Sequence, residues 1–540
     1  MRKLYRGWPT LLVLCLCTAK SSAWEHAAVA KVATAEQLVQ AMLDASATRR
    51  ATVIEVAPGH YILGQTFSSE VGSSVLPPVG SPISIIGRRG ATTTFDASRA
   101  GTDQTGRVFT VLEHGYLTVK NITITSGRAS CQDDCANNGG GAAENHGGIL
   151  AFRRCTLTGS EASSLFFGPL GDPSQNGLGL GGAILNTSGS LFLEDTTVNG
   201  NSTMGAGGGI AVTGGTALIR HSVISANTAR SGPQIWSSVG AGIYVANAEL
   251  SIEESSIEEN INGPDEQNNS RQFGDGGGLY VEGDSEVWIE GSAVTQNQNV
   301  PLGNGGGLFN AGTIHLLNST VGENTTSTIG GGIFNRGTVE LRGVTVAGNT
   351  AFGIIGRDPC EEDHTCPTGG DGIFNDPGAT VRLADTVVAQ NGSDCTGVLM
   401  SLGHNALGSS GGCTLQPVGR HTFGDLLDID VRLGTFVNDG AAGQAHYPLL
   451  ADSPLIDAGG RVARDCTRLD QIGNPRVDGD HDQDRGSICD IGAIEFQRAG
   501  HKQPRANTNS NNDIHDEGDL PRFGEPLRKL DQFLDPSQQR

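Results

Sequence analysis

Hydrophobic positions along the chain recur in units that begin at clusters of glycine. The unit at 330–350, GGGIFNRGTVELRGVTVAGNT, returns with substitutions at 304–325 and 181–203. In each unit an Ile or Leu follows the glycines, two alternate apolar residues come a few positions later, and a fourth lies near the end. Alternation of this kind indicates short strands, three per unit, with their apolar side chains on one side. The first apolar positions of the seven units are Ile184, Ile210, Ile243, Leu279, Leu308, Ile333 and Ile373.

Two columns of asparagine accompany the apolar pattern. Asparagine tolerates the left-handed backbone angles of a turn, and its amide can bond to the same amide one layer above. The units of about 25 residues therefore predict an all-β right-handed parallel β-helix over 31–430. A left-handed β-helix would need hexapeptide repeats, and a propeller would need blades of four antiparallel strands. The columns are Asn186, Asn310, Asn335 and Asn375, and Asn201, Asn227, Asn260, Asn297, Asn324, Asn349 and Asn391.

The two ends of the chain differ from the repeat. Residues 1–23 have a basic start, a short apolar run and small residues before the expected cleavage point, as in a secretory signal peptide. Apolar residues at helical spacing over 33–47 predict a short helix that caps the first coil. Residues 498–540 are polar and are expected to be disordered. No later stretch approaches the roughly 20 apolar residues of a membrane helix, so the mature chain is expected not to span a membrane.

Extra residues interrupt the repeat, always between the second asparagine and the next glycines. The longest interruptions are at 231–240, 262–275 and 352–371. They should therefore all project from one corner of the solenoid, which is where repeat proteins often place binding surface.

The net charge narrows the class of partner, and the cysteine content indicates disulfides. The formal charge of −22 disfavours nucleic acid and anionic lipid, which bind clustered Lys and Arg. An exported chain favours disulfides, and three close pairs are expected to form them. The pairing of the remaining Cys131, Cys135 and Cys155 is left open, and a zinc site made from cysteines is a minor alternative to disulfides. The expected pairs are Cys360 with Cys366, Cys395 with Cys413, and Cys466 with Cys489.

The GGGIFN…GNT units resemble the parallel β-helix repeats of the polymorphic outer-membrane protein group and of the wider pectate-lyase-like superfamily. The segment 453–496, which contains SPLIDAG, DQIGNPR and CDIGAIEF in that order, is similar to the choice-of-anchor Q domain. The resemblance implies an exported, bacterial protein of the cell surface or extracellular space, with such a domain at 431–497. The anchoring signal that usually follows is not recognisable in this sequence.

Two sets of residues are candidate ligand sites. Alternate aspartates in DGDHDQDRG could supply oxygen ligands to a structural Ca²⁺, although the same loop could be a solvated turn held by Cys466 and Cys489. An aromatic residue follows most of the first apolar positions and should point outward, where it could stack on sugar rings. The alternative is a column that only stabilises stacking between coils or is covered by loops. The two sets are Asp478, Asp480, Asp482 and Asp484, and Tyr244, Tyr280, Phe309, Phe334 and Phe374.

Three functions are weighed. The favoured one is a monomeric, non-enzymatic scaffold for adhesion that binds an extracellular glycan or a host protein surface. The alternatives are a Ca²⁺-dependent polysaccharide lyase or glycosidase on the same fold, and a structural spacer. A lyase needs a base, and the units offer arginines but no lysine and no recognisable catalytic motif, so no catalytic residue is assigned. The arginines are Arg220, Arg336, Arg342 and Arg382.

Overall fold

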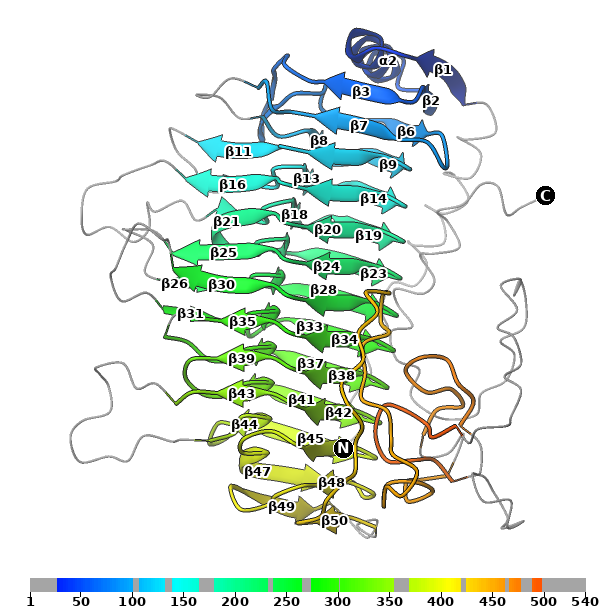
Figure 1. Cartoon of the computed structure of the whole chain (residues 1–540). Coiled ribbons are helices and arrows are strands. Elements are labelled where there is room, and N and C mark those ends of the chain that lie inside the picture. The colour runs from blue at the N-terminus through cyan, green and yellow to red at the C-terminus, as the bar shows by residue number, and fades with distance from the viewer. Residues whose placement is uncertain are drawn as a thin grey trace, which may run out of the picture.

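The computed structural model forms one long solenoid of parallel strands (Figure 1). The structure describes residues 27–100, 106–131, 138–164, 179–231, 237–264, 273–300, 302–353, 369–418, 424–461, 466–476 and 488–497. The signal-peptide prediction at 1–23 and the tail at 498–540 lie outside these residues.

A parallel β-helix is what the repeat predicts, and three long sheets of parallel strands run along the solenoid, the third of them only from β11 to β43. In the 23-stranded sheet, the row that contains the longer strands consists of β1 (Ala28–Val32), β2 (Thr52–Val56), β6 (Pro82–Gly87), β9 (Tyr116–Lys120), β14 (Ile149–Arg153), β19 (Ser190–Glu194), β23 (Gly215–Arg220), β28 (Ala248–Glu253), β33 (Glu286–Glu290), β37 (Thr313–Leu317), β41 (Thr338–Arg342), β45 (Thr380–Ala384), β47 (Cys395–Ser401) and β49 (Cys413–Pro417). The row that follows the glycines consists of β8 (Phe109–Val111), β13 (Ala143–His146), β18 (Ile184–Thr187), β22 (Ile210–Val212), β27 (Ile243–Val245), β32 (Leu279–Val281), β36 (Leu308–Asn310), β40 (Ile333–Asn335) and β44 (Ile373–Asn375).

The other two sheets contain shorter strands. The 13-stranded sheet consists of β3 (Gly59–Ile62), β7 (Thr93–Asp96), β10 (Thr123–Thr125), β15 (Thr156–Thr158), β20 (Thr197–Asn199), β24 (Val223–Ser225), β29 (Ser256–Glu258), β34 (Ala293–Thr295), β38 (Thr320–Gly322), β42 (Thr345–Ala347), β46 (Val387–Ala389), β48 (Ala406–Leu407) and β50 (Leu426–Leu427). The 12-stranded sheet consists of β11 (Arg128–Cys131), β16 (Glu161–Ser164), β21 (Ser202–Ala206), β25 (Thr228–Ser231), β30 (Ile261–Pro264), β35 (Gln298–Asn299), β39 (Thr325–Thr326), β43 (Thr350–Ala351), β12 (Asn138–Gly139), β17 (Gly179–Leu180), β26 (Ser237–Val239) and β31 (Phe273–Asp275). A hairpin of β4 (Phe67–Ser69) and β5 (Gly72–Ser74) lies apart from them.

One coil contains four short strands, one more than the sequence pattern indicates. In the coil that begins at Ile333 these are β40, β41, β42 and β43. The first two both belong to the 23-stranded sheet, so four strands per coil still give three sheets. The predicted first positions pair directly from coil to coil, for example Leu308 with Ile333 and Ile333 with Ile373, and all are fully buried. The apolar core is therefore a stack of identical layers inside the solenoid.

A single helix among the described residues, α2 (Ala35–Thr48), covers the first coil as predicted. The Thr34 hydroxyl accepts the Gln37 N–H and caps the helix N-terminus. Leu38 and Met42 are fully buried against the core. The helix therefore shields an end of the sheets that would otherwise be open. At 14 residues it is too short to cross a membrane, and no membrane-spanning helix is found among the described residues.

The longer asparagine column forms a continuous hydrogen-bonded ladder, whereas the shorter one is interrupted between Asn186 and Asn310 by Val212, Val245 and Val281. The Asn260 side-chain amide donates to Asn297 Oδ1 at 2.9 Å and accepts from Asn227 Nδ2 at 3.0 Å. In the other column Asn310 donates to Asn335 and Asn335 donates to Asn375, each at 2.8 Å. The expectation that these asparagines adopt left-handed angles is wrong. In the longer column the left-handed residue is the one before each asparagine, because that residue turns the chain while the amide points inward; they are Gly200, Ala226, Glu259, Gln296, Glu323, Gly348 and Gln390.

After β50 the chain turns back and runs along the outer face of the 13-stranded sheet (Figure 1, orange). We name the described residues between 429 and 496 the C-terminal clamp. Its Val431, Tyr447 and Ile491 pack on small apolar side chains that point outward from β42, β46 and β48. At its far end the Gly443 N–H donates to the Ser256 hydroxyl of β29, at 3.0 Å. The clamp therefore covers the face from β48 back to β29.

Polar contacts along its length fix the clamp in register with the coils. The Thr320 hydroxyl donates to Gln471 Oε1 at 2.6 Å, and Gln471 Nε2 donates to the carbonyls of Gly443 and Ala445. Cys466 and Cys489 form a disulfide within the clamp, and Cys395 and Cys413 form one between β47 and β49. Both pairs are those predicted.

Candidate functional site

Several predicted sites lie outside the described residues. These are the four aspartates of the Ca²⁺ site, the Cys360–Cys366 pair and most of the three long interruptions. Strands that precede the interruptions, β25, β30 and β43, all belong to the 12-stranded sheet, so the interruptions leave the solenoid from one side. Within the described part of the chain, no group of three or more His, Cys, Asp or Glu side chains could hold a metal ion.

Cys155 is a buried free thiol. Burial raises the pKa of the Cys155 thiol to about 11, so it stays protonated at neutral pH. A protonated thiol is neither a good nucleophile nor a metal ligand, which leaves Cys155 with a packing role in the core.

The predicted aromatic residues form one continuous stack on the outer side of the strands that follow the glycines. Ring centroids of neighbours in the column are 4.7 to 5.8 Å apart. The most nearly parallel pair is Tyr280 with Phe309, whose ring planes make an angle of 4°. Because consecutive strands pair in register, each ring lies one layer above the next. The column therefore stabilises coil stacking, which was one of the two alternatives raised by the sequence.

Exposure divides this column in two. Phe309, Phe334 and Phe374 are only 2 to 4% exposed, and Ile329 packs against them. Their faces are therefore not available to a sugar in this arrangement. Tyr244 and Tyr280 are half-buried and form the accessible end. Of the residues predicted to bind a ligand through this column, only the two tyrosines are accessible.

Charged side chains border the accessible end. The Tyr244 hydroxyl donates to the exposed Glu282 carboxylate at 2.6 Å. Burial and then this bond raise the pKa of Tyr244, and burial raises the pKa of Tyr280 to about 12, so both hydroxyls stay protonated. The Arg336 guanidinium lies over the Phe334 ring at 5.4 Å and pairs with Asp376 at 3.1 Å. This end offers ring edges, hydroxyls and charges of both signs.

A second polar row, missed in the sequence, lies on the outer face of β33, β37, β41 and β45. Trp288 stacks on His315 with centroids 3.8 Å apart. His315 lies 3.3 Å from Glu340, whose other oxygen pairs with Arg382 at 3.0 Å. These four residues occupy one register position in consecutive strands. The signal was present, because they are the middle, outward positions of alternating strands.

Three of the four arginines in the repeat units are held in ion pairs, which bears on the lyase alternative; for the fourth, Arg342, no ion pair is found among the described residues. Arg220 pairs with Glu253 at 3.0 Å, Arg336 with Asp376, and Arg382 with Glu340. A guanidinium held by a carboxylate is stabilised in its charged form and is a poor base. These three arginines therefore hold the coils together and are not arranged as a base for proton abstraction.

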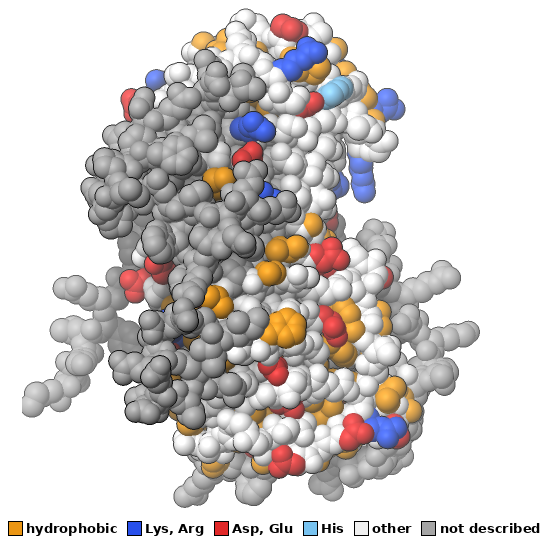
Figure 2. Space-filling model, turned by 60° about the vertical axis from the view of Figure 1, so that its left-hand side comes forward, with side chains coloured by type: hydrophobic (Ala, Val, Ile, Leu, Met, Phe, Trp, Pro, Cys, Tyr) orange, Lys and Arg blue, Asp and Glu red, His pale blue; other side chains and the backbone are white. Residues whose placement is uncertain are grey.

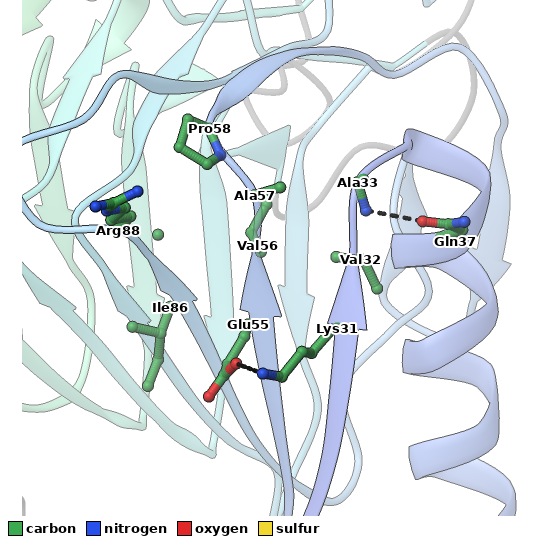
Figure 3. A pocket seen from close by; sticks show the side chains of 11 residues that line it. Lys31, Val32, Ala33, Gln37, Glu55, Val56, Ala57, Pro58, Ile86 and Arg88 are labelled. Carbon is green, nitrogen blue, oxygen red and sulfur yellow. Dashed lines mark hydrogen bonds and ion pairs between the residues drawn. The ribbon is translucent and has the colours of Figure 1, made fainter.

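A cavity of about 500 Å³ lies beside the capping helix, between the ends of β1, β2 and β6 (Figure 3). Two of the polar side chains that line the cavity already have hydrogen-bond or ion-pair partners. Lys31 contacts Glu55 at 3.3 Å, and Gln37 Oε1 accepts the Ala33 N–H at 2.8 Å, as Figure 3 shows. Arg88 is the exposed charge that remains. One exposed arginine in an open hollow does not select a ligand.

Comparison with protein-family models, with curated proteins and with solved structures finds no match. The family resemblances of the sequence therefore stay predictions.

Proposed function

We propose that this protein is an exported β-helix that binds an extracellular glycan without chemical turnover. The observation that carries the proposal is the accessible end of the aromatic column, where Tyr244 and Tyr280 lie half-exposed beside Glu282 and Arg336. Aromatic side chains give broad apolar contact at small entropic cost, and the surrounding polar groups orient a hydroxylated ligand. Export rests on the sequence of residues 1–23, and the assignment to a bacterial cell surface or the extracellular space rests on the family resemblances of the repeat units and of 453–496.

The paired arginines support a binder over a lyase, because a lyase needs an available base. A structural Ca²⁺ at Asp478, Asp480, Asp482 and Asp484 remains part of the proposal. An anchoring domain at 431–497 similar to choice-of-anchor Q, and a monomeric state, also remain proposals.

The test is retention of residues 24–540 on a glycan panel that includes polygalacturonate, alginate and neutral polysaccharides, with and without Ca²⁺. Retention without product is expected, and the Tyr244→Ala variant should bind about tenfold more weakly because it loses ring contact and a hydroxyl. Tyr244→Phe separates the hydroxyl from the ring. Phe352→Ala is the matched control, since Phe352 is 65% exposed and lies outside the column. Unsaturated products that absorb in the ultraviolet would show that the protein is a lyase.

A further inference from the structure

One part of the outer surface carries no charge although the chain as a whole is strongly acidic. It consists of the outward positions of β10, β15, β20 and β24 in the 13-stranded sheet, on the N-terminal side of the clamp (Figure 1). Charged side chains border it: Asp96 of β7 lies at one end, and Arg154, Asp195 and His221 lie two residues before β15, β20 and β24. Between Asp96, paired with His60 at one end, and Glu258 at the other, the outward positions of these strands are Thr, Asn, Ser and Val. Figure 2, which shows a neighbouring side of the molecule, has acidic side chains on its upper and its lower coils.

The hydroxyls on this face form a regular array. Thr94, Thr123, Thr156 and Thr197 pair directly from strand to strand. A second column, two residues further along each strand, consists of Thr125, Thr158, Asn199 and Ser225. Neighbouring coils are about 4.8 Å apart and the two columns about 6.6 Å, so the array is flat and periodic.

The residues between the two columns show which way the array faces. Phe95, Ile124, Leu157, Val198 and Ile224 alternate with the hydroxyl positions and are fully buried in the core. The hydroxyl-bearing side chains therefore point outward, and each is partly exposed.

Hydrogen-bonding capacity on this face is unused. Within the described chain, the hydroxyls of Thr123, Thr156, Thr158 and Thr197 take part in no hydrogen bond. A separate observation is that Asn199 Oδ1, in the middle of the array, is shielded from solvent and has no donor among the described residues. A shielded acceptor without a donor is costly and is usually explained by a missing partner.

We propose that this face binds an uncharged, ordered polysaccharide, with one row of sugar hydroxyls on each column of Thr and Asn. Threonine suits such a ligand because its hydroxyl bonds to sugar hydroxyls while its methyl group contacts the C–H faces of the rings. The absence of charge matches an uncharged ligand and would give no attraction to a polyanion or a basic protein. The proposal rests on glycan binding as the function, and it adds the class of glycan and a surface separate from the tyrosines.

The lower half of the same sheet supports this assignment. There the clamp covers small apolar outward positions, such as Ala347 and Ala389, and hydroxylated ones. The Ser256 hydroxyl accepts the Gly443 N–H, the Thr320 hydroxyl donates to Gln471 Oε1, and the Thr345 hydroxyl accepts the Ala493 N–H. In the covered part, outward hydroxyls of this sheet are thus hydrogen-bonded to a covering segment, a partner that the hydroxyls of the upper part lack among the described residues. The upper face is therefore suited to a partner that brings its own hydroxyls.

The experiment is co-sedimentation of residues 24–540 with insoluble cellulose and chitin, and gel retardation by polygalacturonate. The double variant Thr156→Val, Thr158→Val keeps side-chain shape and removes two hydroxyls, and it should bind the neutral polymer about tenfold more weakly. Thr158→Asp, which introduces a charge, should bind still less. The matched control is Thr313→Val, Thr338→Val, which removes two outward hydroxyls from the 23-stranded sheet. Melting temperatures should be unchanged in every variant.

The possible outcomes separate the two proposals. Neutral binding that weakens only in the Thr156/Thr158 variants supports this site. Neutral binding that these variants leave intact, but that Tyr244→Ala weakens, overturns this site and keeps the proposed function. Binding to polygalacturonate alone overturns the uncharged ligand. Binding to no polysaccharide overturns both.

Discussion

At the scale of single residues, the fold depends on side chains that form hydrogen bonds to the coils on both sides at once. The Asn260 Oδ1 accepts from the backbone and side-chain N–H groups of Asn227, while its Nδ2 donates to Asn297 and to the Ile224 carbonyl. Aspartate lacks the donors and leucine lacks both functions. A second ladder that the sequence did not suggest runs beside the core, where the Ser222, Ser255 and Ser292 backbone N–H groups each donate to the hydroxyl of the next coil.

Replacing one ladder residue should therefore destabilise the whole stack. We expect Asn260→Ala to lower the free energy of unfolding by about 3 kcal/mol, because the buried backbone and side-chain N–H groups of Asn227 lose their acceptor and the Ile224 carbonyl loses the amide donor. Urea denaturation followed by circular dichroism measures this. Thr313→Ala, on the outer face, should change it by less than about 0.5 kcal/mol. Equal effects of the two substitutions would mean that the ladder contributes little.

The sequence predicted these residues well where one physical rule acts alone. The first apolar positions and both asparagine columns repeat at fixed places, so their stacking followed directly. The exposure of Phe309, Phe334 and Phe374 could not be predicted, because alternation tells which side a residue faces and not what lies over it. Trp288 and His315 were missed for a different reason: the register that brings them together is visible only once the two coils are aligned strand by strand.

At the scale of elements, the clamp is the feature that the repeat did not reveal. It has little regular secondary structure among its described residues, so neither the helical nor the strand spacing of apolar residues identifies it. A signal did exist in the strands that it covers. From β42 onward the outward positions of the 13-stranded sheet, except Thr345, become small and apolar, which exposed strands of a solenoid do not need. Outward Ala347, Val387 and Ala389 mark a covered face.

Gln471 is the residue on which clamp docking should depend most. It is 4% exposed and its side-chain amide joins Thr320 to the carbonyls of Gly443 and Ala445. We expect Gln471→Ala to raise hydrogen exchange in 441–447 and 469–476 by at least about tenfold, since three buried polar groups lose their partners. Hydrogen exchange with mass spectrometry reports this by segment. Exchange in β10, β15 and β20 should stay unchanged, and Gln497→Ala, at an exposed site, should have no effect.

At the scale of the whole molecule, the clamp ties together coils that would otherwise contact only their neighbours. A solenoid is close to one-dimensional, and each coil is stabilised by the next. A segment that reaches from β48 to β29 adds contacts across many coils, so the lower part should unfold as one unit. The upper coils lack such a clamp among the described residues and are closed by α2.

The buried network at the end of the clamp gives this stability a pH dependence. Arg476 pairs with Glu495 at 3.2 Å, and both are about 1% exposed, while Asp490 lies beside them. Burial, aided by Asp490, raises the pKa of Glu495, and burial raises the pKa of Asp490. Both folded pKa values exceed the unfolded values of about 4, so the contribution to stability is full below about pH 4 and is lost as pH rises through the raised pKa values.

We therefore expect the melting temperature of the Glu495→Gln variant to change less with pH than that of the wild type, over about pH 5 to pH 8. Differential scanning calorimetry at several pH values gives the slopes. The comparison is between slopes, since the substitution also weakens the pairing with Arg476. Glu249→Gln, at an exposed position, should keep the wild-type slope. A Glu495→Gln slope as steep as that of the wild type would contradict the assignment of the raised pKa.

The longer asparagine ladder also has a direction and a fixed end. Each amide donates toward the C-terminus until Asn391, whose Nδ2 donates to Asp394 at 3.0 Å. An aspartate side chain accepts hydrogen bonds but has no N–H to donate to the next coil, so the ladder stops there. Every position between Asn201 and Asn391 gives and receives in the same way. Whole coils could thus be duplicated or deleted between Asn201 and β29, where the clamp does not reach, which makes the length of the molecule adjustable without a change to its cap or its clamp.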